Sequence, residues 1–152
     1  MADPAFYMYR RRLPHWRLGG ATYFGTWRLQ RGQPDLTPAE RTLVVSAIKH
    51  FEHERYELTA FVVMNDHVHV LVTPLGAHGL EDITHSWKSY TTHCFQQRTG
   101  RHGSVWLDES FDRVVRDEAE LWEKVEYILN NPRKRWPEIT EYPWVWAQGQ
   151  ES

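Results

Sequence analysis

The stretch FVVMNDHVHVLVTP, residues 61–74, is the most apolar part of the chain and constrains the fold more than any other segment. Two runs rich in β-branched and aliphatic residues flank a central Asn-Asp pair. This arrangement is typical of a β-hairpin with a tight turn. We therefore predict strands over residues 56–64 and 67–73, joined by a turn at Asn65-Asp66.

Two histidines lie one residue apart in the second of these strands. Alternate side chains of a strand point to the same face, so His67 and His69 should lie side by side, with Cβ atoms roughly 6–7 Å apart. They are either polar residues on a half-exposed sheet or two ligands of one divalent ion. Cys94 is the sole cysteine, which excludes a thiolate cluster. A third ligand from Asn, Gln, Asp or Glu would suit Mg²⁺ or Mn²⁺.

The remaining elements predict an α+β fold. Further strands are expected over 21–30 and 111–116, and helices over 37–54, 80–97 and 119–131, the last ending before Pro132. Thr37, Pro38 and Glu40 predict a capping box. The order indicates a ferredoxin-like antiparallel sheet (β-α-β-β-α-β), helices on one face, with an extra C-terminal helix. Residues 1–152 should form one domain, with an arm over 1–16 and an irregular tail over 133–152.

The last predicted helix carries a tyrosine that its apolar stripe does not explain. The stripe comprises Leu121, Trp122, Val125, Ile128 and Leu129. Tyr127 falls nearly opposite it, with Asn131 one turn later and Lys124 one turn earlier. Tyr127 is either a surface residue lying over a loop or a functional group. Tyr90, the rival tyrosine, belongs to the stripe of its own helix and is expected in the core.

The histidine pair and Tyr127 together suit a phosphoryl transfer. A phenol, whose ordinary pKa is near 10, is a weak nucleophile at neutral pH. A divalent ion on the phosphate oxygens makes phosphorus more electrophilic. Attack by Tyr127 would give a phosphotyrosine that keeps the bond energy for a second, joining step. Asn131 could supply the third ligand, and Lys124 a proton acceptor or phosphate contact.

The same residues resemble a known family. His67-Val68-His69, preceded by VVMND, resembles the HUH motif of single-tyrosine DNA transposases, and FDRVVRDEAELWEKVEYILNNPRKRW is similar to the C-terminal signature of REP-associated tyrosine transposases. The resemblance implies an HUH fold, metal ligands at His67, His69 and Asn131, and a nucleophile at Tyr127. It implies cleavage and rejoining of single-stranded DNA beside palindromic hairpins, through a 5′-phosphotyrosine intermediate and with Mg²⁺ or Mn²⁺.

Charge and composition bear on the partner. The formal net charge of −2 gives no overall basic field. Two basic and aromatic clusters, either solvated faces or DNA contacts, could bind phosphates and stack on bases. They comprise Arg10, Arg11, Arg12 and Trp16 in the arm, and Arg133, Lys134 and Arg135 after the last helix. We expect a cytoplasmic, nucleoid-associated monomer or homodimer that binds single-stranded or hairpin DNA of the REP-like palindrome type, without a membrane segment.

Two other functions fit parts of the pattern. A relative that binds hairpin DNA without cutting it would keep the same fold. The HVHVLV segment is also similar to histidine-triad nucleotide hydrolases, but their third histidine, the nucleophile, corresponds here to Leu71.

Overall fold

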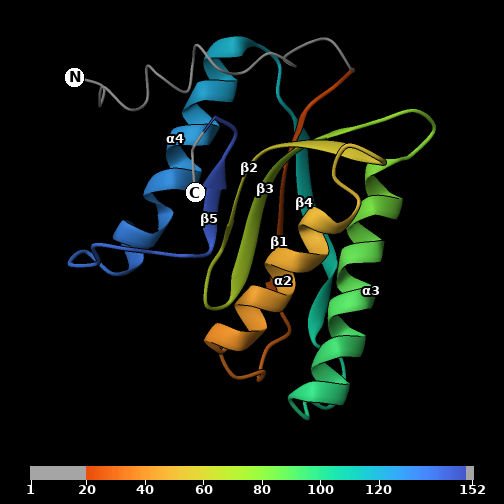
Figure 1. Cartoon of the computed structure of the whole chain (residues 1–152), viewed down its shortest axis with the longest axis vertical. Helices are drawn as coiled ribbons and strands as arrows, with labels where there is room; N and C mark the ends of the chain where they lie inside the picture. Colours follow the sequence, from red (N-terminus) through yellow and green to blue (C-terminus); the bar gives the residue numbers. More distant parts are fainter. Residues whose placement is uncertain (1–19, 150–152) are drawn as a thin grey trace.

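The computed structural model describes residues 20–149 and forms a single sheet with helices on both faces (Figure 1). The predicted arm over residues 1–16 lies outside the described part of the chain. In chain order the elements are β1 (Tyr23–Leu29), α2 (Pro38–His50), β2 (Tyr56–Val63), β3 (His67–Pro74), α3 (Leu80–Arg98), β4 (Trp106–Val114), α4 (Glu118–Arg135) and β5 (Val145–Ala147).

The five strands are antiparallel, in the order β4-β1-β3-β2-β5. The first four have the strand order of two interleaved βαβ units, so the predicted ferredoxin-like fold is confirmed. β3 is central and is paired on both sides, with β1 and with β2. The apolar hairpin of the sequence therefore forms the middle of the sheet, and the histidines of β3 lie on a strand that is hydrogen-bonded along both edges.

Two hydrophobic layers hold the helices on the sheet. α2 and α3 cover one face, as predicted, and α4 covers the other, against β2, β3 and β5 (Figure 1). Alternation along β3 divides its side chains between the layers. Val68, Val70 and Val72 enter the α2/α3 core, whereas Leu71 enters the α4 core. His67 and His69 thus face the α4 side.

The predicted capping box at the start of α2 is present, and its glutamate also takes part in a buried ion pair. Thr37 and Glu40 form the capping box, and the Glu40 carboxylate also binds the Arg101 guanidinium through contacts of 2.6 and 2.7 Å. Burial alone would raise the pKa of Glu40. Hydrogen bonds from Arg101, the Thr37 backbone N–H and Thr99 outweigh burial and lower this pKa to about 2. The ion pair ties α2 to the loop that follows α3.

Three predicted boundaries are wrong near the C-terminal half. β4 begins at Trp106 rather than 111, because pairing with β1 overrides the low strand propensity of its Asp and Glu residues. α4 continues to Arg135, since the Trp136 N–H bonds to the Pro132 carbonyl and Pro132 is buried. The tail is not wholly irregular: β5 pairs with the edge of β2. Three residues are too few to show a strand period.

The expectation that Tyr90 is a core residue is also wrong. Its side chain is 53% exposed, whereas Ile83, Trp87 and Cys94 of the same helix are buried. Tyr90 lies at the edge of the α3 stripe, about 60° from Trp87 on a helical projection. As for membranes, residues 20–149 include no helix that combines the length and the apolar character needed to cross one.

Candidate active site

The histidine pair forms a compact cluster on the α4 side of β3. The ring centroids of His67 and His69 are 4.7 Å apart, and the planes are steeply inclined at 73°. His69 is buried and His67 is partly exposed. The predicted sharing of one face is confirmed, and this face is the one that α4 covers only in part.

Each imidazole is held through its Nδ1 atom. His67 Nδ1 lies 2.6 Å from the Asp66 carboxylate, and His69 Nδ1 lies 2.8 Å from the Thr26 hydroxyl across the sheet. A carboxylate can only accept, so the neutral His67 ring carries its proton on Nδ1 and leaves Nε2 as a lone pair. If His69 donates to Thr26 in the same way, its Nε2 is equally open, which is the arrangement of a metal-binding histidine.

Electrostatics keep His69 uncharged. Burial is the main cause that lowers the pKa of His69, and the neighbouring His67, Arg28 and Lys124 act in the same direction; together they bring this pKa to about 3. The ring is therefore neutral at physiological pH. A neutral imidazole is the form that binds a divalent cation.

Tyr127 of α4 lies directly beside this cluster. Its ring meets the His69 ring edge-on, with centroids 5.2 Å apart, and its side chain is 37% exposed. Phe24 of β1 stacks on the His69 ring with centroids 5.4 Å apart, and it meets the Tyr127 ring edge-on with centroids 6.0 Å apart. As predicted, Tyr127 lies outside the buried stripe of α4. The contact brings the phenol and the histidine pair together within one chain.

The other predicted residues of α4 continue this side of the helix. Asn131, one turn after Tyr127, is buried, although its side chain is polar. Lys124 lies 5.0 Å above the Phe24 ring, and Lys134 lies 4.9 Å above the Tyr127 ring. Two ring nitrogens and an amide would suit Mn²⁺ or Mg²⁺ in an open site. In their chemistry, these three side chains fit the implied metal.

The predicted DNA-binding residues are only partly brought to this site. Lys124 and Lys134 adjoin it, as described above. Arg133 is exposed on the last turn of α4, and Arg135 lies over the Trp136 ring at 5.5 Å. Arg135 and Trp136 also line a pocket of about 650 Å³, which is formed by the end of α4, the segment that follows it and Arg41 of α2. Arg10, Arg11, Arg12 and Trp16 lie outside the described residues.

Sequence reasoning did not find the residues that orient the imidazoles. Asp66 was assigned to the turn alone, although its position next to His67 was a usable signal. Thr26 and Phe24 lie more than forty residues from His69 in the chain. Only the β1–β3 register, which pairs Thr26 with His69, brings them together. A strand register of this kind is set by the whole sheet rather than by a local motif.

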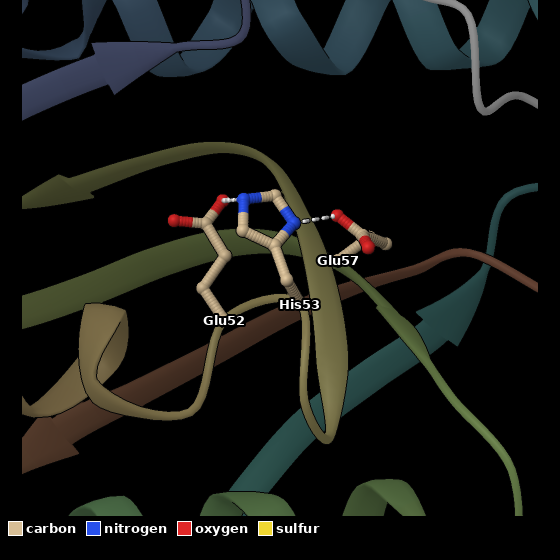
Figure 2. A group of neighbouring side chains, drawn as sticks. All are labelled: Glu52, His53 and Glu57. Carbon is tan, nitrogen blue, oxygen red and sulfur yellow. Dashed lines mark hydrogen bonds and ion pairs between the residues drawn. The ribbon is translucent and has the colours of Figure 1, made fainter.

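A second group of potential ligands lies elsewhere. His53 faces Glu57 at 2.6 Å through Nδ1 and Glu52 at 3.9 Å through Nε2, in the turn between α2 and β2 (Figure 2). Both ring nitrogens thus face carboxylates, an arrangement that an ion pair explains. Glu57 is roughly 17 Å along β2 from Val62, the partner of His69. The group is separate from the Tyr127 cluster.

The fold is shared with a transposase of known structure. The structure described as the REP-associated tyrosine transposase bound to a REP hairpin matches with a TM-score of 0.70 and 24% identity, covering 84% of this chain and 76% of that one. A family model described as "Transposase IS200 like" matches residues 37–131, and the chain belongs to this family. The REP-associated tyrosine transposase of Escherichia coli (strain K12) is 24% identical over 131 residues, 82% of this chain and 74% of the relative. The resemblance inferred from the motifs is confirmed.

Proposed function

We propose that this chain is a transposase that cleaves and rejoins single-stranded DNA next to palindromic hairpins, with Tyr127 as the nucleophile. The observation that carries the proposal is the edge-on contact between Tyr127 and His69, at 5.2 Å between centroids. A tyrosine that only covered a loop would have no reason to meet a buried, uncharged imidazole. The family match supports the transposase class.

In the first step, Tyr127 Oη attacks the phosphorus of a phosphodiester. The Oη–P bond forms as the P–O3′ bond breaks, so the DNA 5′ phosphate is left on the tyrosine and a 3′ hydroxyl departs. The phenol loses its proton and the departing oxygen gains one. A second 3′ hydroxyl reverses the reaction and joins a new strand. Mg²⁺ or Mn²⁺, held by His67, His69 and Asn131, would supply charge stabilisation at the phosphate oxygens.

The chain positions charge and a hydrophobic support around the nucleophile. Phe24 and His69 pack against the Tyr127 ring and limit its movement. The Lys124 ammonium lies over the Phe24 ring, and the Lys134 ammonium lies over the Tyr127 ring. Both positive charges are therefore close to the nucleophile and suited to attract a phosphate. Holding the attacking group and a phosphate in a fixed relation removes much of the entropic barrier.

The proposed substrate is a DNA hairpin with a single-stranded flank. The matched solved structure is described as bound to a REP hairpin, and this partner is extended to the present chain as part of the proposal. Arg133 and Arg135, at the end of α4, are exposed and are suited to contact phosphates beyond the cleaved bond. We also propose that Arg10, Arg11, Arg12 and Trp16 contribute DNA contacts.

The second candidate is a hairpin-binding module without cleavage activity. It is disfavoured because the site keeps its orienting bonds, from Asp66 to His67 and from Thr26 to His69, which binding alone does not require. A histidine-triad hydrolase is disfavoured because Leu71, at the third alternating position, is buried against α4.

A covalent-adduct assay tests the proposal. The protein is incubated with Mn²⁺ and labelled oligonucleotides that carry palindromic hairpins from the DNA flanking the gene, and a denaturing gel detects protein-linked label. Tyr127→Phe should lose the adduct because it lacks the attacking oxygen. Tyr90→Phe is the matched control, since Tyr90 is an exposed helical tyrosine on the opposite face of the sheet.

The outcomes separate the candidates. An adduct that is absent in Tyr127→Phe and retained in Tyr90→Phe supports the transposase. Hairpin binding with no adduct for the wild-type protein, under both Mg²⁺ and Mn²⁺, supports the binding module. An adduct that persists in Tyr127→Phe would assign the nucleophile to another residue.

A further inference from the structure

One large aromatic side chain near the Tyr127 cluster has no role in the core. Phe111 of β4 is 64% exposed, more than any other large hydrophobic residue within residues 20–149. It lies in the interior of a regular strand, where alternation assigns each side chain to one face. An exposed phenyl ring in a strand offers a flat apolar surface on which a partner could stack.

The strand register places Phe111 on the same face as the histidines. Phe111 pairs with Thr26 of β1, and Thr26 pairs with His69 of β3, so the three residues form a row across the sheet. Two strand spacings put the backbones of Phe111 and His69 about 9–10 Å apart. Among residues 20–149, α4 packs mainly on β2, β3 and β5, so it covers the β1–β4 half of this face less completely.

Cationic side chains border the same half of the sheet face. Arg28 of β1 is exposed and pairs in register with His67, and Arg113 of β4 is exposed two residues after Phe111. Arg113 is 2.8 Å from the Glu120 carboxylate, which holds its guanidinium at the start of α4. An aromatic ring between two guanidinium groups is complementary to a nucleotide, because bases stack on rings and phosphates bind cations.

We propose that Phe111 is a stacking platform for an unpaired base of the DNA strand, next to the phosphodiester that Tyr127 attacks. The proposal rests on the proposed function and adds to it a binding site on the β1–β4 half of the sheet. The ligand is a nucleobase in single-stranded DNA, and its recognition by a phenyl ring should be largely independent of sequence. Arg28 and Arg113 would contact the phosphates on either side.

Binding measurements on two DNA probes test the platform. Both are fluorescein-labelled hairpins copied from palindromes flanking the gene, one blunt and one with a single-stranded tail on each side. Phe111→Ala should weaken binding of the tailed probe by about 5- to 150-fold, measured as Kd by fluorescence anisotropy. Binding of the blunt probe should stay unchanged. Phe111→Trp should restore the wild-type Kd, because a larger ring still stacks.

Val114→Ala is the matched control, because Val114 is also exposed on β4 but points to the opposite face. It should leave both Kd values unchanged. The proposal is overturned if Phe111→Ala binds the tailed probe like wild type, or if it loses affinity equally for both probes. Failure of the wild type to bind either probe would overturn the platform together with the proposed function. If the wild type forms the covalent adduct while Phe111→Ala binds the tailed probe with the wild-type Kd, the platform alone is overturned.

Discussion

Replacing Thr26 by valine should weaken metal binding without unfolding the protein. The Thr26 hydroxyl lies 2.8 Å from Nδ1 of His69 and comes from the neighbouring strand of the sheet. When His69 donates from Nδ1 to this hydroxyl, the bond fixes the proton on Nδ1 and keeps Nε2 available. Valine has nearly the same shape and fits the same half-buried strand position, but it cannot accept the Nδ1 proton.

The size of the effect follows from the other contacts of the His69 ring. Loss of a partner that orients a metal-binding histidine typically costs 10- to 100-fold in metal affinity. Phe24 still stacks on the ring at 5.4 Å, and Tyr127 still meets its edge. These contacts keep the ring in place, so the loss should be near the lower limit. We expect about tenfold weaker Mn²⁺ binding, or about 1.4 kcal/mol.

Isothermal titration of Mn²⁺ into the DNA-free protein measures this affinity. Thr22→Val is the control, because it removes a 2.6 Å hydroxyl contact with Thr73 in the same strand pair without touching an imidazole. Urea unfolding of both variants tests whether their stability is comparable. Equal Mn²⁺ affinities for wild type and Thr26→Val would refute the orienting role. An equal loss in Thr22→Val would attribute the effect to the sheet.

Two further predictions concern the histidines and the buried ion pair. His67→Ala and His69→Ala should abolish the covalent adduct, because the metal acts at the cleaved bond rather than along the hairpin. Hairpin affinity, measured by fluorescence anisotropy, should stay within about threefold of the wild-type value. A loss of hairpin affinity as large as the loss of adduct would contradict this prediction. Since the pKa of Glu40 falls from 4.5 to about 2 on folding, its stabilisation is complete above pH 4.5 and is lost as the pH falls towards 2. Urea unfolding should therefore show about 3 kcal/mol lost by wild type in this window, and a much flatter profile in Glu40→Gln.

Local patterns were sufficient to predict the elements that build the site. The alternation of His67, Val68 and His69 fixed which residues share a face, and the stripe of α4 excluded Tyr127 from the core. Both inferences need only the period of a strand or a helix. The capping box at Thr37 and Glu40 was predictable for the same reason, since a cap involves residues only three apart.

Features that depend on distant partners were not predictable. The bond from Thr26 to His69 and the row that includes Phe111 require the registers of three strands. The strand β5 exists because the edge of β2 offers unpaired backbone groups, not because Val145–Ala147 has a strong pattern. Tyr90 shows the converse error, since a residue at the edge of a stripe is buried or exposed according to what packs beside it.

The strand β5 has a consequence for how α4 can move. A helix that is joined to its sheet at only one end could swing out by a hinge motion and pack against a neighbouring molecule. Here the chain returns to the sheet after α4. Tyr142 donates a hydrogen bond to the Val63 carbonyl, and β5 pairs with the edge of β2. Release of the helix would require β5 to separate from β2, which would leave the backbone groups of Ala60–Val62 without their hydrogen-bond partners. The tether thus favours a tyrosine that serves the histidines of its own molecule.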